Sequence, residues 1–209
     1  LAFTMAAAMT LSLAACGGDS GSSAAGSTPS GSDASSAGST SAAVPEGTAF
    51  KVGATGPLTG GASIYGLAAY HGAQIAVDEI REAGGDIQFE LRYEDDQNVP
   101  ETAVNAYNTL KDWGMQISLG SVTTQPGIAT SVYNFGDRIF ALTPSASSPD
   151  VISGKDNVYQ MCFSDPNQGL ASAQYIYEQS LGESIYVIWK NDDPYSTGIY
   201  NQFVAESER

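Results

Sequence analysis

The chain has little positive charge. Only 8 lysines and arginines stand against 23 aspartates and glutamates among its 209 residues, which gives a formal net charge of −15. Nucleic acids and anionic membrane surfaces would repel such a chain, so we expect neither as an electrostatic partner. The length allows one large domain or parts of two.

Histidine and cysteine are also scarce, with one His and two Cys. A Ser–His–Asp triad would have to use His71, which stands inside an expected helix, and no G-x-S-x-G nucleophile elbow occurs. Metal sites need several His or Cys ligands at fixed spacing, which are lacking. The glycines of "GATGPLTGG" fit neither the dinucleotide nor the P-loop fingerprint. We therefore expect no enzyme activity, no cofactor and no metal.

The chain opens with an uncharged apolar run, "LAFTMAAAMTLSLAA", followed by Cys16 and two glycines. Its length matches a secretory h-region and falls short of the ~20 residues that a spanning helix needs. The stretch "LAAC" resembles the bacterial lipobox, whose cysteine receives a lipid and becomes the mature N-terminus. We expect residues 1–16 to be a signal peptide that lacks its own start, with Cys16 as the lipid anchor. The alternative is a plain signal peptide with an incidental cysteine.

Residues 17–48 are dominated by Gly, Ser, Ala and Thr. Such a segment buries too little apolar surface to offset its ordering entropy, so we expect a flexible tether. If Cys16 is lipidated, only Cys162 remains and no internal disulfide can form. We interpret Cys162 as a buried structural thiol. An anchor and a tether place the folded part outside the membrane, close to its surface.

Strand and helix signals alternate in the rest of the chain. The expected strands are 50–55, 87–95, 115–120, 138–143, 157–163 and 184–190. The expected helices are 67–83, 100–113, one from about 125, 170–181 and one from about 195. Asp165 is placed to cap the fourth helix, with Pro166 at its first position. This alternation predicts an α/β fold with a doubly wound parallel sheet.

Ligands of open α/β sheets bind at the carboxyl ends of the strands. Three turns expected there, in "TGPLTGGASIYG", "GSVTTQPG" and "TPSASSP", contain no charged residue. They offer hydroxyls, backbone N–H groups and helix N-termini, which suit one carboxylate, whereas a phosphate would more often recruit Lys or Arg. The alternative is that these residues only form turns and caps. We interpret "YEDDQNVPE" as a solvated turn, because it lacks the central glycine of a calcium loop.

Several collinear motifs resemble a known family. The run "FKVGATGPLTGGASIYGLAAYHGAQIAVDEIREAGG" resembles the N-terminal signature of the branched-chain amino acid ABC-transporter substrate-binding proteins, of the periplasmic binding protein type 1 group. So do "YEDDQNVPETAV", "GSVTTQPGIA", "LTPSASSPDV" and "FSDPNQGLASAQYI". The resemblance implies two α/β lobes that enclose a ligand. It places the first lobe at residues 49–163 and the start of an incomplete second lobe at 164–209.

The resemblance also implies the binding residues. The motifs carry over six of them: Tyr65, Ser121, Thr123, Ser145, Ser147 and Tyr195. In the family, hydroxyls at the positions of Ser121 and Ser147 bind the ligand carboxylate, and the position of Ser145 contributes backbone groups. Tyr65 and Tyr195 would cover the ligand from opposite lobes. The family usually has threonine at position 147, and its acidic partner for the ligand ammonium falls beyond Arg209.

The resemblance therefore implies a lipid-anchored, extracytoplasmic solute-binding component of an ABC importer. It would bind a branched-chain or similar small amino acid and deliver it to a membrane permease. Alternatives within the same fold are an amide, urea or small aromatic acid as ligand, or a sensor that binds its ligand without transport. An enzyme of the outer surface is the third class.

Overall fold

The computed structural model describes residues 48–209. The expected signal peptide, the lipid-anchor Cys16 and all but the last residue of the expected tether lie outside the described residues. The strands are β1 (Thr48–Gly56), β2 (Ile87–Asp95), β3 (Ile117–Ser121), β4 (Phe140–Thr143) and β5 (Val158–Gln160). The helices are α1 (Ser63–Ala83), α2 (Pro100–Trp113), α3 (Thr124–Gly136), α4 (Asp165–Glu178) and α5 (Pro194–Ser207), with a short 3₁₀ helix, η1, at Pro149–Val151.

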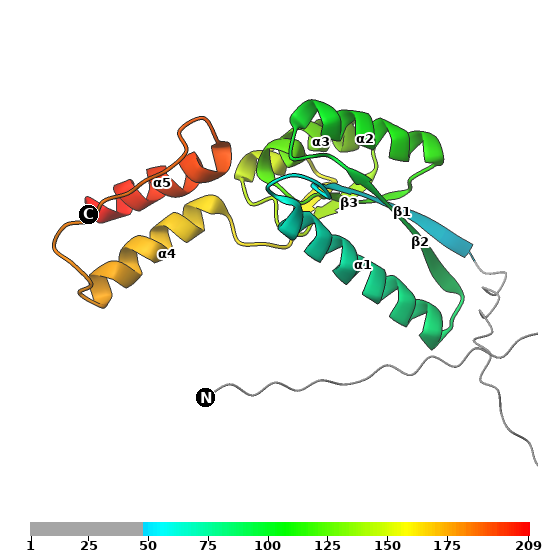
Figure 1. Cartoon of the computed structure of the whole chain (residues 1–209), viewed down its shortest axis with the longest axis horizontal. Helices are drawn as coiled ribbons and strands as arrows, with labels where there is room; N and C mark the ends of the chain where they lie inside the picture. Colours follow the sequence, from blue (N-terminus) through cyan, green and yellow to red (C-terminus); the bar gives the residue numbers. More distant parts are fainter. Residues whose placement is uncertain (1–47) are drawn as a thin grey trace, which may run out of the picture. The chain divides into compact units, whose positions relative to one another are not determined.

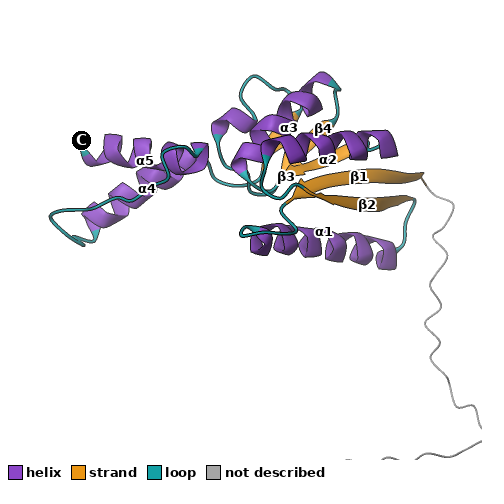
Figure 2. Cartoon of the chain, turned by 45° about the horizontal axis from the view of Figure 1, so that its top comes forward, coloured by secondary structure: helices purple, strands orange, loops and turns teal. Residues whose placement is uncertain are grey.

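The strands form one parallel sheet in the order β2-β1-β3-β4-β5 (Figure 1). Helix α1 covers one face, whereas α2 and α3 cover the other, as Figure 2 shows. The prediction of a doubly wound parallel sheet is therefore confirmed. The strand order reverses between β1 and β3, and the crevice at the carboxyl ends of strands beside such a reversal is where this architecture binds ligands.

Helix α2 shows how the sequence specifies its own packing. Pro100 occupies the start of the helix, where its missing N–H costs nothing, and Gly114 ends it with a left-handed φ of 94°. The buried face carries Tyr107 and Leu110, which pack with Met115 in one core cluster. Burying a side chain such as Leu110 contributes about 2 kcal/mol. The helix has the bounds that the sequence predicts.

Two helix starts differ from the prediction. Helix α1 begins at Ser63 rather than near residue 67. Helix α4 is capped by Ser164, whose hydroxyl accepts a hydrogen bond from the Asn167 N–H at 3.4 Å, so Asp165 is its first residue and not its cap. No helix in the described part of the chain is both long and apolar enough to cross a membrane.

The strand expected at 184–190 is wrong. The segment has no strand pairing, and Tyr186 and Ile188 are 95% and 98% exposed. Trp189 instead stacks on Tyr200 of α5, with ring centroids 3.6 Å apart. A run of β-branched and aromatic residues favours a strand, but a strand also needs a neighbour to accept its backbone hydrogen bonds. None of the described strands pairs with this segment.

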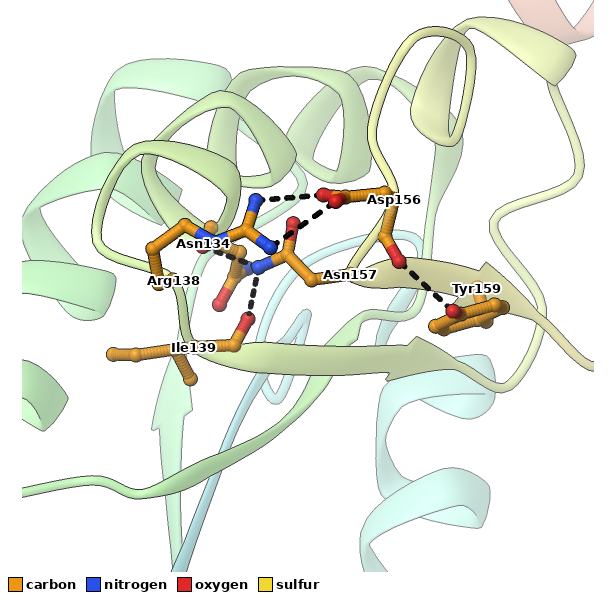
Figure 3. A network of polar contacts seen from close by, with 6 residues as sticks. All are labelled: Asn134, Arg138, Ile139, Asp156, Asn157 and Tyr159. Atoms are coloured by element: carbon orange, nitrogen blue, oxygen red, sulfur yellow. Dashed lines mark hydrogen bonds and ion pairs between the residues drawn. The ribbon is translucent and has the colours of Figure 1, made fainter.

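A polar cluster fixes the start of the edge strand β5 against α3 and β4 (Figure 3). The side-chain amide of Asn157 donates to the carbonyl oxygens of Asn134 and Ile139 at 2.9 and 2.8 Å. Arg138 contacts both carboxylate oxygens of Asp156 at 2.6 and 3.2 Å. These bonds hold the β4–β5 end of the sheet in register, and the loops after both strands contribute to the site described next.

Candidate binding site

A cavity of about 530 Å³ opens at the carboxyl ends of the strands. Every loop that follows a strand contributes to its wall, as does the segment before and into α5. Its lining residues are Ala62, Tyr65, Asn98, Val122, Thr123, Thr124, Gln125, Ser145, Ser147, Cys162, Phe163, Lys190, Asp193 and Tyr195. The volume lies within the range of small-molecule sites, and the location agrees with the switch-point rule.

Five of the six expected binding residues line this cavity: Tyr65, Thr123, Ser145, Ser147 and Tyr195. The Thr123 hydroxyl oxygen is buried and has no hydrogen-bond partner. The Ser145 hydroxyl donates to the carbonyl oxygen of Val122, which ties the β3 and β4 loops together. The two tyrosines are 66% and 40% exposed, so their rings can meet a ligand without rearranging the core.

Ser121 is the exception. It is fully buried and does not line the cavity. Its hydroxyl lies 2.6 Å from the Thr55 hydroxyl and 3.1 Å from the Thr130 hydroxyl. Successive side chains of a strand point to opposite sides, and the next residue, Val122, faces the cavity. The structure thus places Ser121 behind the wall, as a support for it.

The wall also holds charges that the uncharged strand-end turns do not predict. Lys190 and Asp193 both line the cavity, so its lining is not free of ionisable groups. Asp193 caps α5, with a carboxylate oxygen 3.4 Å from the Ser196 N–H. Lys190 directly precedes the stretch "NDDPYSTG" and Asp193 lies within it, but only the folded chain shows that this stretch reaches the β3 loop. There the side-chain amide of Gln125 donates to the Asp192 carbonyl oxygen at 3.3 Å.

Asn98, Cys162 and Phe163 were not expected in the site either. Burial raises the pKa of the Cys162 thiol, and the charge of Asp165 adds to the effect, so the thiol is poorly reactive. The thiol therefore acts as a small apolar group of the wall. The signal for Asn98 lies in the turn "QN", where Gln97 and Asn98 have left-handed φ values of 54° and 60°.

Asp165 lies just outside the lining. It is fully buried, and neither of its carboxylate oxygens has a hydrogen-bond partner. Its N–H donates to the Ser147 carbonyl oxygen at 3.1 Å, and its side chain packs against Gly198 of α5. Burial raises the pKa of this carboxyl and the nearby charge of Asp193 raises it further, whereas the proximity of the Ser147 hydroxyl opposes both without forming a hydrogen bond to either oxygen. Asp165 thus lies between the β4 loop and α5, where its ionised form is destabilised by burial and by the charge of Asp193.

The cavity wall combines hydroxyl, backbone, carboxylate and aromatic groups from different segments. Thr123, Ser145 and Ser147 come from the loops after β3 and β4, and the first residues of α3 add backbone N–H groups that have no partner inside the helix. The carboxylate of Asp193 comes from the segment before α5, and the rings of Phe163 and the two tyrosines supply apolar surface. Such an arrangement can accept a small molecule with an anionic end, an apolar part and a cationic group.

Asp95 holds the loop after β1 in place. One of its carboxylate oxygens accepts hydrogen bonds from the N–H groups of Leu58 and Gln97 at 2.8 and 3.0 Å, and the other accepts from the Thr59 hydroxyl. Burial alone would raise the pKa of Asp95, but these hydrogen bonds outweigh it and lower the pKa. The carboxylate of Asp95 therefore fixes the position of the loop after β1, which leads to Tyr65.

We expect Asp95→Ala to destabilise the protein by about 2 kcal/mol at pH 7, since hydrogen bonds to a charged group are lost. Because the folded-state pKa is depressed, the wild-type contribution should be present above the ordinary aspartate pKa and lost as the pH falls through the folded value. Urea unfolding at several pH values measures both the loss of stability in Asp95→Ala and the pH dependence of the wild-type contribution. Asp86→Ala, at an exposed loop position, is the control. An equal loss of stability in both variants would contradict the role of Asp95 in holding this loop.

Comparison with known proteins identifies relatives of the whole described region. Residues 49–208 match the model of a family described as periplasmic binding protein. The Leu/Ile/Val-binding protein BraC3 of Rhizobium johnstonii is 30% identical over 157 residues, which cover 74% of this chain and 42% of that protein. A Leu/Ile/Val-binding protein homolog of Brucella melitensis is 31% identical over 158 residues, with the same coverage. The chain thus spans less than half the length of these relatives.

Solved structures of related proteins share the fold of this chain. The leucine binding protein LivK of Thermotoga maritima has a TM-score of 0.71 at 27% identity, over 76% of this chain and 45% of that one. The substrate binding protein LivJ of Streptococcus pneumoniae, solved in complex with isoleucine, has a TM-score of 0.72 at 25% identity, over 76% and 47%. With a family match that spans most of the chain and a shared fold, this chain belongs to the periplasmic binding protein family.

Proposed function

We propose that the protein is the solute-binding component of an ABC importer, and that the cavity at the strand ends takes a branched-chain or similar small amino acid. The observation that carries the proposal is the combination of groups in this one cavity. Its lining joins hydroxyls and the α3 N-terminus to the carboxylate of Asp193 and to aromatic rings. An α-amino acid has the complementary charges.

Each part of such a ligand finds a chemically matching group in the wall. Its carboxylate suits the Thr123 hydroxyl, the backbone of Ser145 and the first turn of α3, where N–H groups point out of the helix. Its ammonium group suits Asp193, and its aliphatic side chain suits the rings of Tyr65 and Tyr195. The names of the relatives, which refer to leucine, isoleucine and valine, support this ligand class.

The wider function is part of the same proposal. We propose that residues 49–163 form one lobe and that 164–209 begin a second, which closes on the ligand by a hinge motion. Cys16 would carry a lipid that holds the protein at the outer face of the cell membrane, and residues 17–48 would be the tether. The closed form would deliver its ligand to a membrane permease. Family membership supports an extracytoplasmic location.

Calorimetry on the full-length protein tests the ligand. We expect leucine, isoleucine or valine to bind at one site. Thr123→Val keeps the shape of the side chain but removes its buried, unpartnered hydroxyl, and should weaken binding by about 1–3 kcal/mol because the ligand loses a hydrogen-bond donor.

Thr109→Val, on the exposed surface of α2, is the matched control and should leave the affinity unchanged. If benzoate or another aromatic acid binds while all three amino acids fail, the proposed ligand class is wrong. If Thr123→Val binds as tightly as the wild type, Thr123 is not a ligand contact.

A further inference from the structure

One buried network connects the strands and loops around the cavity. The hydroxyl chain, defined as Thr55, Ser121 and Thr130, runs from β1 through β3 to α3 with oxygen separations of 2.6 and 3.1 Å. It ends on the Pro126 carbonyl oxygen, to which Thr130 donates at 3.0 Å. Pro126 directly follows Gln125, a residue of the cavity wall. The three hydroxyl residues are all buried.

Asp96 stands at the other end of this chain. It is fully buried, one carboxylate oxygen has no partner, and the other accepts from the Asn98 N–H at 2.9 Å. Asn98 lines the cavity in a left-handed conformation, which asparagine adopts more readily than most non-glycine residues when local hydrogen bonds hold it. Its position therefore depends on the acceptor that Asp96 provides.

The surroundings of Asp96 leave its charge uncompensated. Tyr93 of β2 and the neighbouring Asp95 are the titratable groups that interact with it, and Thr55 of β1 contributes a hydroxyl. None of the ion pairs among residues 48–209 involves Asp96. Burial raises the pKa of Asp96 to about 6; the charge of Asp95 adds to this, whereas the Asn98 N–H and the Thr55 hydroxyl oppose it.

Proton counting shows what this titration would change. Each hydroxyl of the chain has one proton to donate. Thr55 lies close enough to influence Asp96, although no hydrogen bond joins it to the free carboxylate oxygen in the structure. If a protonated Asp96 turns to donate to Thr55, the chain can run on through Ser121 and Thr130 to the Pro126 carbonyl. If an ionised Asp96 accepts from Thr55 instead, Ser121 and Thr130 reverse their donation. Through this contact the charge of Asp96 would set the direction of the hydroxyl chain as far as the first turn of α3.

We propose that Asp96 is a positioning residue of the cavity, whose ionised carboxylate holds the Asn98 turn and the hydroxyl chain in the form that binds ligand. This inference rests on the proposed function, because it concerns the same cavity. An ionised carboxylate is the stronger acceptor for the Asn98 N–H, so the ionised form is the one that binds. Ligand binding would therefore release a proton, and acidification would release the ligand.

The test is calorimetry with leucine on the full-length protein between pH 5 and pH 7.5. If only the ionised form binds, the dissociation constant should rise about tenfold at pH 5, where about a tenth of Asp96 is ionised. Asp96→Asn should bind more weakly than wild type at pH 7.5, with an affinity that no longer changes with pH. Asp112→Asn, on the exposed surface of α2, should keep the wild-type profile. A wild-type affinity that stays constant over this range would overturn the inference and leave the ligand assignment intact.

A second measurement needs neither a ligand nor the Asp96 variant. The backbone amide resonance of Asn98 in the ligand-free wild type should follow a single titration near pH 6. Thr130→Val interrupts the hydroxyl chain outside the cavity wall and should shift the midpoint of that titration. If the amide chemical shift of Asn98 stays constant between pH 5 and pH 8, the proposed role of Asp96 is wrong, even if leucine binds.

Discussion

Replacing Gly66 by alanine should destabilise the protein by about 3 kcal/mol, the upper range for overpacking a close contact. Gly66 is buried in the first turn of α1, and a Cβ there would overlap the Pro57 carbonyl group, with the carbonyl carbon only 2.6 Å away. Both partners are backbone, so neither can rotate aside. The start of α1 and the loop after β1 would have to separate.

Gly72→Ala is the matched control, because it makes the same change in the same helix. Gly72 is exposed, and nothing lies within 4 Å of its added Cβ. Alanine has the higher helix propensity, so this variant should gain up to about 1 kcal/mol. Urea unfolding of the two variants should therefore give changes of opposite sign. A Gly66→Ala variant as stable as wild type would contradict the close approach of α1 to Pro57.

The same comparison extends to binding. Tyr65 precedes Gly66 and lines the cavity, so displacement of the α1 start should move its ring. Gly66→Ala should consequently lose affinity for leucine under conditions in which it remains folded, whereas Gly72→Ala should bind as the wild type does. The pair of variants separates damage to the site from a general effect of adding a methyl group to α1.

Asp165→Asn should stabilise the protein at pH 7.5, by about 2 kcal/mol, the scale on which unsatisfied buried groups act. The wild-type carboxylate is fully buried without a hydrogen-bond partner for either oxygen, and Asp193 adds repulsion. The amide of asparagine has nearly the same shape and no charge. It removes the repulsion and the cost of burying an ion.

The pH dependence gives the sharper test. Because the folded-state pKa of Asp165 is raised, the folded protein binds more protons than the unfolded one between the two pKa values. Stability should therefore fall as the pH rises through that window, and the penalty should be complete above it. Asp165→Asn should remove this slope, whereas Asp112→Asn should keep it. A loss of stability in Asp165→Asn at pH 7.5 would show that the folded protein uses the charge.

Local signals were enough to predict most of the elements. The bounds of α2 followed from Pro100 and Gly114, and those of β2 from its strict alternation, because each of these signals acts within its own element. The segment 184–190 has the same kind of signal but no strand beside it, and pairing is not a property of the segment alone. The parallel sheet followed from the alternation of strands and helices.

The site was harder to predict, because a cavity joins residues that are distant in sequence. The uncharged loops led to Thr123, Ser145 and Ser147, but not to Lys190 or Asp193, which reach the same cavity from the segment before α5. Ser121 was assigned to the ligand because of its residue type and its place in the motif. Its environment depends on which side of β3 it faces, and that side carries Thr55 and Thr130.

The inner position of β1 has a consequence for how the protein is made. The backbone N–H of Lys51, in β1, donates to the side-chain oxygen of Gln116, just before β3, across 65 residues of sequence. On the ribosome, β1 emerges long before this partner, and closing so long a connection costs entropy before any pairing repays it. The pairing of β1 with β3 therefore follows the synthesis of β2 and α2, which stand between them in the sequence. Until β3 emerges, one side of β1 has no strand to accept its backbone hydrogen bonds.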